Sequence, residues 1–334
     1  MSARGAWLFA ALLVAAAAAA MALAGANPAA GFFALVRGAL GGEHQLSETL
    51  VQTTALLFPS LAVALAFRAG LFNIGAEGQL IVGGLFAGVA GAAIAAPAWI
   101  AIPLILAAGA AGGGFWGGIA GALRARFGGN EVIATLMLNI VAALVANYLV
   151  GGPLHSAAAT GAETPELATT SWLPVLLGGT RLTVAFPLAL ALAAFLRYVL
   201  DGTVFGYSLR AAGDAPQAAA RAGIDLGRTA LVAMTLSGAI AGLGGATLVA
   251  GVLHRFNVAL SPGYGFIAIA VALVGGLDPL RIVLAAFAFG ILQSGSLTMQ
   301  ALAHVPKDTV TFIEGLAIVG LSARHFAGRR REAG

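Results

Sequence analysis

Long apolar runs separated by short polar connections fill most of the chain. A helix needs roughly 20 mainly apolar residues to cross a bilayer. The runs are rich in Ala, Leu, Val and Gly and lack the alternation of membrane-barrel strands, so they predict an all-α, polytopic transmembrane bundle that forms one domain over residues 1–334. Ten helices are predicted, at about 6–24, 50–67, 76–96, 98–122, 131–151, 182–199, 229–253, 264–280, 282–299 and 309–322.

The first run has a second interpretation. Its basic start, alanine-rich centre and small residues Ala22 and Ala24 are also typical of a cleavable signal peptide. We expect an uncleaved helix, because many further spans follow it. Cleavage would leave nine spans with the same orientation.

Composition agrees with a membrane protein. Of the 334 residues, 60% are hydrophobic and 9% are charged, whereas about a quarter of the residues in a soluble domain are charged. The formal net charge of +4 comes from basic residues scattered singly between the spans, which fits the positive-inside bias better than nucleic-acid binding. The chain has no cysteine, which excludes disulfides and thiolate-metal sites.

The basic residues also predict the orientation. With the N-terminus in the cytoplasm, most arginines fall in inner connections, as the positive-inside rule requires. Both termini are then cytoplasmic, the long connection 153–181 lies outside and 200–228 lies inside. The inner set is Arg4, Arg68, Arg124, Arg126, Arg197, Arg210, Arg221, Arg228, Arg281, Arg324, Arg329, Arg330 and Arg331, and the outer set is Arg37, Arg181, Arg255 and Lys307.

The inner connection 200–228 is expected to be partly helical. Asp214 is a candidate N-cap for a short helix at 215–222, with Pro216 in its first turn and Gly223 at its end. From composition alone, a solvated loop that follows the charge rule is the simpler interpretation of this segment.

Glycines recur at every fourth position in several predicted helices. Small residues on one face let neighbouring helices approach closely in lipid. We therefore assign to packing, with no chemistry, Gly84 and Gly88, Gly109, Gly113, Gly117 and Gly121, and Gly238 and Gly242.

Two polar, glycine-bearing stretches interrupt the apolar pattern: FRAGLFNIGAEGQL at 67–80 and HRFNVALSPGYGFIAIAVALVGG at 254–276, where Ser261 is a candidate N-cap and Pro262 the first helical residue. Transporters place binding sites at broken helices, because irregular backbone at membrane depth needs a cavity beside it. A tight cytoplasmic turn is the alternative for 67–80. The spans that follow the two stretches run in opposite directions, which predicts an inverted five-plus-five repeat.

Charged groups at membrane depth are costly and mark candidate functional positions. The acidic candidates are Glu77, Glu131 and Glu314. Glu131 follows Asn130, a candidate N-cap, and is expected to serve the helix start. Glu314 fits an interfacial position and a cavity-lining position equally well. Asn139 fits either an interhelical hydrogen bond or a pore-lining position.

The sequence carries no sign of catalysis. Its single lysine, Lys307, precedes Asp308, so no Gly-x-x-x-x-Gly-Lys-Ser/Thr phosphate loop exists and any ATP must bind another polypeptide. There is no His-Glu-x-x-His pair, and the five histidines lie in connections without clustering. We predict neither an enzyme nor a catalytic, metal or cofactor site.

Five motifs carry a family resemblance over about residues 50–322: FRAGLFNIGAEGQLIVGG, GGNEVIATLMLNIVA, GYSLRAAGDAPQAAARAGI, SGAIAGLGGA and SPGYGFIAIAVALVGGLDPL. They resemble the permease subunits of bacterial ABC importers, in the branch that takes up nucleosides, ribose and related simple sugars. The resemblance implies half of an inner-membrane pore that works by alternating access. The implied partners are a second homologous permease, two cytoplasmic ATP-binding subunits or domains, an extracytoplasmic substrate-binding lipoprotein and a small-molecule substrate, with no nucleic acid.

The resemblance also implies roles for residues. It makes 200–228 the segment that couples to the ATPase, and the GAEGQ form of the first motif favours nucleosides as the substrate. The residues that match the family's coupling pattern are Gly206, Ser208, Arg210, Ala211 and Gly213.

A nucleoside path needs aromatic faces for the base and amides or hydroxyls for the ribose. Glu77 and Glu314 are expected to be gating or structural residues. The candidate path residues are Phe72, Asn73, Gln79, Asn139, Phe256 and Tyr264.

Two other functions stay open. The same type of importer carrying sugars or branched-chain amino acids would differ in its binding protein. An ion-coupled secondary transporter would need no ATPase and would use membrane carboxylates such as Glu77 or Glu314.

Overall fold

The computed structural model describes residues 3–157, 161–306, 308–313 and 315–316, and it confirms the all-α class. Within these ranges, β pairing is limited to two isolated bridges. In chain order the helices are α1 (Ala3–Leu23), α2 (Pro28–Leu40), α3 (Glu43–Arg68), α4 (Ala76–Ala93), α5 (Ala98–Phe127), α6 (Glu131–Gly151), the 3-10 turn η1 (Thr169–Ser171), α7 (Ala185–Gly202), α8 (Val204–Asp214), α9 (Pro216–Arg221), α10 (Leu226–Leu248), the π turn η2 (Val249–Leu253), α11 (Tyr264–Val274) and α12 (Pro279–Ala303).

In the described part of the chain, seven helices are long and apolar enough to cross a membrane, and α1 with α2 makes an eighth if that bent pair is one span. A polytopic helical bundle is therefore confirmed, with fewer spans than the ten that the apolar pattern predicts. Half of the last predicted span, 309–322, falls outside the described residues, which include helical stretches at 308–313 and 315–316.

The apolar pattern does not predict the helix α2, which begins at a sharp bend. α1 and α2 meet at 113°, and between them Gly25 takes a left-handed φ of +78°. Asn27 then caps α2, since its Oδ1 accepts the Ala29 amide at 2.9 Å, and Pro28 fills the first helical position. The Asn-Pro pair is thus a start signal that a search for long apolar runs passes over.

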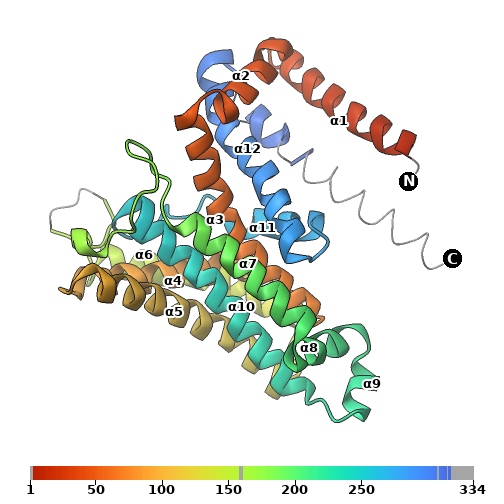
Figure 1. Cartoon of the computed structure of the whole chain (residues 1–334), viewed down its shortest axis with the longest axis vertical. Coiled ribbons are helices and arrows are strands. Elements are labelled where there is room, and N and C mark those ends of the chain that lie inside the picture. Colours follow the sequence, from red (N-terminus) through yellow and green to blue (C-terminus); the bar gives the residue numbers. More distant parts are fainter. Residues whose placement is uncertain (1–2, 158–160, 307, 314, 317–334) are drawn as a thin grey trace.

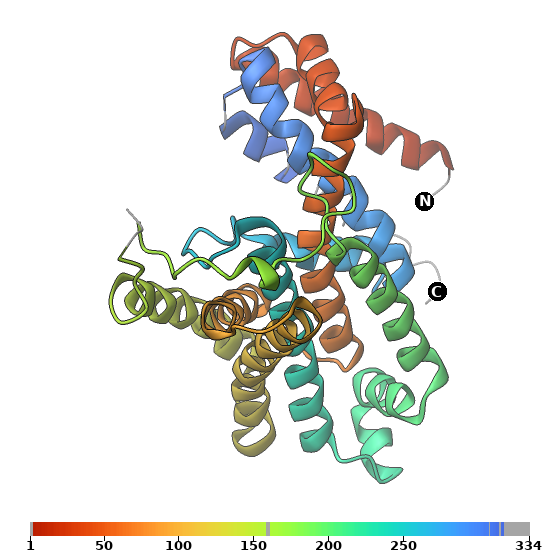
Figure 2. The same cartoon turned by 60° about the vertical axis from the view of Figure 1, so that its left-hand side comes forward.

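Glycines set the separation of α4, α5 and α10. A Cβ added to Gly83 would lie 2.2 Å from the Gly242 Cα, and one added to Gly113 would lie 2.3 Å from the Gly238 carbonyl oxygen. The packing role predicted for the glycine rows is confirmed, because a side chain at these positions would collide with neighbouring backbone. Figures 1 and 2 show the resulting bundle, with α1, α2 and α12 standing to one side and joined to it through α3.

The helix α11 is half a span and ends before the apolar run predicted at 264–280 does. It covers Tyr264–Val274, about 16 Å at 1.5 Å per residue, against roughly 30 Å of hydrocarbon. Left-handed backbone ends it, with φ of +65° at Gly276 and +58° at Leu277. The Leu277 amide donates to the Ala272 carbonyl at 3.0 Å, as in a Schellman ending.

The start of α6 agrees with the sequence. The Asn130 Oδ1 accepts the Val132 amide at 2.9 Å, which confirms Asn130 as the N-cap. Glu131 occupies the first turn, 3.6 Å from Arg124. A carboxylate at this end of a helix is favoured by the helix dipole.

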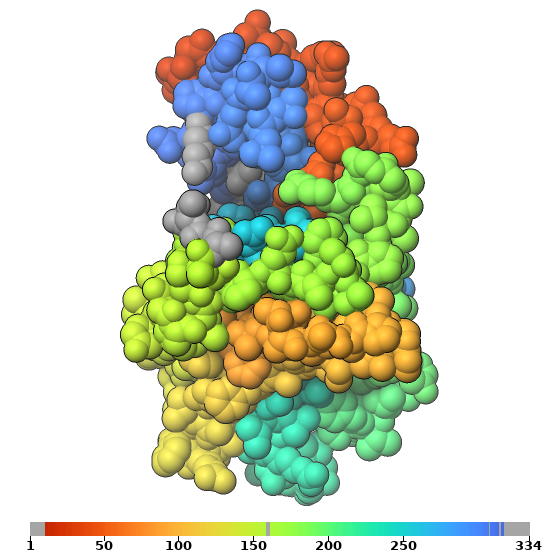
Figure 3. All heavy atoms as spheres, turned by 90° about the vertical axis from the view of Figure 1, so that its left-hand side faces the viewer, coloured from red at the N-terminus to blue at the C-terminus, as the bar shows by residue number. Residues whose placement is uncertain are grey.

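The long connection 153–181 is hydrogen-bonded to the residues that follow α10 and η2. The Leu167 amide donates to the His254 carbonyl at 2.8 Å, and the Thr164 amide donates to the Phe256 carbonyl at 3.0 Å. The ring of Trp172 stacks on His254 with centroids 3.8 Å apart. In Figure 3 this connection, in light green, lies across the face of the molecule between α12 and the α4–α5 region.

Candidate functional site

The two broken stretches predicted from the sequence meet in space. The Glu77 carboxylate, in the first turn of α4, accepts the Gly265 amide at the start of α11 with a 2.7 Å bond. The backbones touch as well, because a Cβ added to Gly265 would lie 2.2 Å from the Glu77 nitrogen. Ser261 acts on the same end of α11, since its Oγ accepts the Tyr264 amide at 2.9 Å. We call this contact between the starts of α4 and α11 the junction.

Pro262 does not open α11 as predicted, because the helix starts two residues later, at Tyr264. The residue before Tyr264 is Gly263, with a φ of +99°. Ser261 nevertheless bonds the first amides of the helix in the manner expected of a cap.

Two hydrogen bonds fix the distance that the chain covers between the end of α3 and the start of α4. At the end of α3, the Arg68 Nε donates to the Leu277 carbonyl at 3.1 Å, just beyond the end of α11. Glu77 holds the opposite end of α11, so residues 69–76 span about the length of that helix, roughly 16 Å. That distance is about half the hydrocarbon thickness of a bilayer.

The junction places one carboxylate where two helix starts converge. Unpaired amides and the helix dipole make each start electropositive. Glu77 is only 7% exposed, and it offsets this positive end by accepting an amide of the partner helix. The predicted structural role of Glu77 has this contact as its physical basis. Glu314, its predicted counterpart, lies outside the described residues.

The side-chain amides of Asn73 and Gln79, which are predicted to line the path, are hydrogen-bonded to each other near the junction. The Asn73 Nδ2 donates to the Gln79 Oε1 at 2.9 Å and to the Ser237 Oγ at 2.8 Å, and the Gln79 Nε2 donates back to the Asn73 Oδ1 at 3.1 Å. Ser237 in turn donates to the Ala62 carbonyl at 2.6 Å. This cluster holds the extended segment before α4 against α10 and α3.

Asn139 performs the same task from α6. Its Oδ1 accepts the Gly78 amide at 2.8 Å, and its Nδ2 donates to the Ile74 carbonyl at 2.9 Å. One side chain therefore satisfies an orphan donor of the first turn of α4 and a carbonyl of the irregular segment before it. In this structure Asn73, Gln79 and Asn139 hold the break together.

The three predicted aromatic residues lie in different surroundings. Phe72 is 56% exposed and packs on Phe67, with ring centroids 4.9 Å apart, at the side of α11. Phe256 is fully buried against α4, where a Cβ on Gly88 would lie 2.7 Å from it. Tyr264 lies at the junction and its hydroxyl donates to the Gln52 Oε1 at 2.8 Å.

A cavity of about 550 Å³ opens beside Tyr264, between α3, α11 and α12. Its polar wall is a stripe on α12 formed by Gln293, Ser296 and Gln300. Spacings of three and four residues place these side chains on one helix face. The spacing of these three polar residues is visible in the sequence, within ILQSGSLTMQ. A search for charged residues and broken helices does not find it.

At the other end of the molecule, α8 and α9 project beyond α7 and α10 (Figures 1 and 2). Asp214 is the last residue of α8 and does not cap α9, so that prediction is wrong: Thr203 starts a helix over 204–214 that the sequence pattern does not predict. Pro216 does begin α9, and Gly223, with a φ of +89°, follows its end.

The predicted coupling residues divide into packing and polar groups. A Cβ added to Gly206 would lie 2.2 Å from the Val199 carbonyl oxygen, and one added to Gly213 would lie 2.5 Å from the Arg68 carbonyl oxygen. α8 therefore rests directly on the ends of α7 and α3. Ala211 is half-buried in the same helix, the Ser208 Oγ donates to the Val204 carbonyl at 2.9 Å, and the Arg210 Nη1 donates to Asp201 at 3.2 Å.

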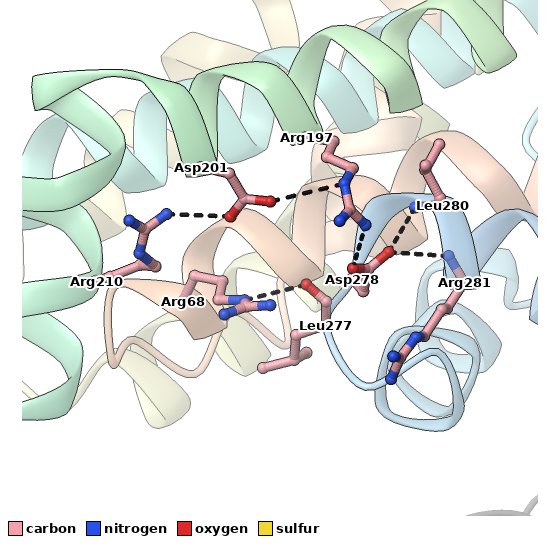
Figure 4. A network of polar contacts seen from close by, with 8 residues as sticks. All are labelled: Arg68, Arg197, Asp201, Arg210, Leu277, Asp278, Leu280 and Arg281. Atoms are coloured by element: carbon pink, nitrogen blue, oxygen red, sulfur yellow. Dashed lines mark hydrogen bonds and ion pairs between the residues drawn. The ribbon is translucent and has the colours of Figure 1, made fainter.

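Figure 4 shows how these charges continue from α8 to α12. Arg210 pairs with Asp201, and Asp201 lies 3.7 Å from Arg197. Arg197 donates to the Asp278 Oδ2 at 2.5 Å. The other oxygen of Asp278 accepts the Arg281 amide at 3.1 Å and so caps α12. The network links α7 and α8 to the turn between α11 and α12.

Asp278 stays ionised through these contacts. Burial by itself would raise the pKa of Asp278, but hydrogen bonds from the Arg281 and Leu280 amides, together with the charge and hydrogen bond of Arg197, outweigh burial and hold the pKa below its ordinary value.

Comparison with known proteins agrees with this architecture. Residues 45–321 match the model of the family described as the branched-chain amino acid transport system / permease component. The chain belongs to this permease family. No solved structure matches the permease.

Relatives of this family cover most of the permease. It is 37% identical over 308 residues to the guanosine ABC transporter permease protein NupP of Bacillus subtilis, which covers 91% of this chain and 88% of the relative. It is 34% identical to the glucose ABC transporter permease protein TsgB13 of Haloferax volcanii, over 87% of this chain and 80% of the relative. It is 32% identical to the nucleoside ABC transporter permease protein NupB of Lactococcus lactis, over 81% and 78%. The permease is thus a membrane subunit of the ABC importer type.

Proposed function

We propose that the permease translocates nucleosides in an ATP-driven importer. The observation that carries this proposal is the 37% identity to a guanosine permease over 91% of the chain. The nucleoside permease NupB, at 32% identity, supports the same substrate class. The form of the break, with GAEGQ at 75–79, favours nucleosides by the same resemblance.

The contacts support a route by which a motor reaches the pore. Gly213 of α8 rests on the end of α3, where Arg68 holds the far end of α11. Glu77 holds the near end of α11 at the start of α4. Displacement of α8 by an ATPase would therefore be transmitted to the junction through short, packed contacts, as in rigid-body switching between two access states.

The proposed partners are those that the family resemblance implies. α8 presents Val204 and Tyr207, which are 83% and 62% exposed, at the end of the molecule that carries the arginine network. We assign this surface to one of two cytoplasmic ATP-binding subunits or domains. A second homologous permease would complete the pore, and an extracytoplasmic binding lipoprotein would deliver substrate on the side of 153–181. The permease would then lie in the bacterial inner membrane with both termini in the cytoplasm.

A sugar is the second candidate substrate, because TsgB13, a glucose permease, is 34% identical over 87% of the chain. Branched-chain amino acids have only the family description in their favour. For an ion-coupled carrier, the carboxylate of Glu77 would have to take part in coupling, and in this structure it is engaged with the Gly265 amide.

Uptake of tritiated guanosine by cells that lack their own nucleoside importers tests the proposal. The permease is expressed together with the proposed partners, an ATPase, a second permease and a binding protein. We expect uptake that unlabelled nucleosides compete for and that glucose and leucine do not. Competition by glucose with no effect of nucleosides would instead assign the permease to sugars.

A further inference from the structure

The cavity between α3, α11 and α12 has a wall of polar side chains on α12. Elsewhere in the bundle, glycines bring α4, α5 and α10 into direct backbone contact. Here a space of about 550 Å³ remains, within the range of small-molecule sites. Amide and hydroxyl side chains are costly in a membrane unless they bond one another or a ligand.

The polar groups of the cavity lie opposite each other. Gln293, Ser296 and Gln300 form the stripe on α12, and Gln52 on α3 lines the same space. Tyr264 joins the two sides at the junction, since its hydroxyl donates to the Gln52 Oε1 at 2.8 Å. Their bonds within the protein include Ser296 Oγ to the Gln293 carbonyl at 2.8 Å and Gln300 Nε2 to the Ser296 carbonyl at 3.3 Å. An amide oxygen or hydroxyl accepts more than one bond, so a ligand can join this set.

Thr311, in the helical stretch 308–313, adds one more hydroxyl, and the rest of the lining is apolar. Phe289 and Leu292 of α12 and Ile267 of α11 face the same space as the Tyr264 ring. These groups offer a surface for a flat, weakly polar ring system, and the stripe offers hydrogen bonds for hydroxyls.

Charge selects between ligand classes. No acidic or basic side chain is among the described residues that line the cavity. A zwitterionic amino acid or a nucleotide would find no partner of opposite charge among these described side chains, and an unpaired charge at membrane depth is costly. An uncharged solute with several hydroxyls carries no such penalty.

The cavity also lies next to the junction of α4 and α11, to which the proposed mechanism transmits the displacement of α8. Phe289, ten residues into α12, lines the cavity together with Tyr264 of the junction. Tyr264 is at once the first residue of α11 and part of the lining. A ligand in the cavity would therefore contact the end of α11 that Glu77 holds.

We propose that this cavity is a substrate site within the permease itself, which takes an uncharged solute bearing hydroxyls and a flat ring, such as a nucleoside. The site rests on the transport function proposed above. Specificity would then be set in the membrane as well as in the binding protein.

The absence of cysteine makes the site testable by chemical protection. Ser296→Cys and Gln300→Cys each place a single thiol in the cavity, and Ala168→Cys, at an exposed position of the outer connection, is the matched control. The assembled importer in membranes is treated with N-ethylmaleimide, with and without guanosine. At about ten times the Kd, occupancy predicts labelling roughly tenfold slower in the cavity and unchanged at residue 168.

Guanosine monophosphate and leucine are the charged comparisons, and neither is expected to protect. Protection by either one equal to that of guanosine would overturn the argument from charge. Labelling of both cavity thiols that guanosine does not slow, in an importer that still takes up guanosine, would overturn the site and leave the transport function standing. An importer that takes up no nucleoside would fail at the transport function instead.

Discussion

The ion pair between Arg197 and Asp278 makes a sharp prediction about coupling. Asp278 has two roles on one carboxylate: it caps α12 through the Arg281 amide and pairs with Arg197 on α7. Asparagine caps a helix about as well as aspartate, so Asp278→Asn removes the ion pair alone, whereas Asp278→Ala removes both roles.

The expected magnitudes follow from exposure. The side chains of Arg197 and Asp278 are 43% and 18% exposed, so solvent screens the pair and it contributes about 0.2–1 kcal/mol. Loss of the cap costs about 1 kcal/mol more. Thermal unfolding in detergent should therefore show a small decrease for Asp278→Asn and a larger one for Asp278→Ala.

The coupling of ATP hydrolysis to uptake should change strongly even where thermal stability changes little. If the pair transmits motion from α7 and α8 to α12, Asp278→Asn will raise the ATP hydrolysed per nucleoside taken up while hardly lowering thermal stability. Arg197→Gln should have the same effect, and the double variant should be no worse than either single one, as expected for partners in one interaction.

Asp225 provides the matched control. It caps α10, with its Oδ1 accepting the Arg228 amide at 2.9 Å, and no ion pair to it is found in the described part of the chain. Asp225→Asn should leave both stability and coupling near those of the wild type. The reasoning would be refuted if Asp278→Asn matched Asp225→Asn in both measurements.

Three further predictions concern acid, packing and the junction. Because the folded pKa of Asp278 is lowered, the stabilisation from its charge is present above the ordinary carboxyl pKa and is lost as pH falls through the lowered value, so the difference in unfolding midpoint between wild type and Asp278→Asn should vanish only in strong acid. Gly113→Ala puts a methyl 2.3 Å from the Gly238 carbonyl oxygen and should cost about 1–3 kcal/mol, whereas Gly178→Ala, with nothing within 4 Å, should unfold like the wild type. Glu77→Gln keeps an acceptor for the Gly265 amide but removes the charge, so it should destabilise by about 0.3–2 kcal/mol and slow uptake, and unchanged uptake would contradict the role of the junction.

The sequence identifies the places where the helices break, because glycine, amides and a carboxylate interrupt apolar runs at 67–80 and 254–276. It does not show how the breaks close. Asn73 bonds Ser237, 164 positions away, and Glu77 bonds Gly265, 188 positions away. Contacts at such separations depend on the packing of the whole bundle and leave no local pattern.

Two omissions from the sequence prediction have local causes. The glycines after Val274 are visible in the sequence, but their left-handed backbone, which halves the span, appears only in the structure. The stripe Gln293, Ser296 and Gln300 has a helical spacing that can be read directly, yet a search for charge misses neutral amides. The inverted repeat stays a prediction.

The source of energy for uptake is the most direct test of the account. The permease and its proposed partners (an ATPase, a second permease and a binding protein) are reconstituted in proteoliposomes. Guanosine accumulation is measured with ATP, with a non-hydrolysable analogue, or with a sodium or proton gradient alone. The account predicts accumulation only with hydrolysable ATP. Accumulation driven by an ion gradient in the absence of ATP would contradict it.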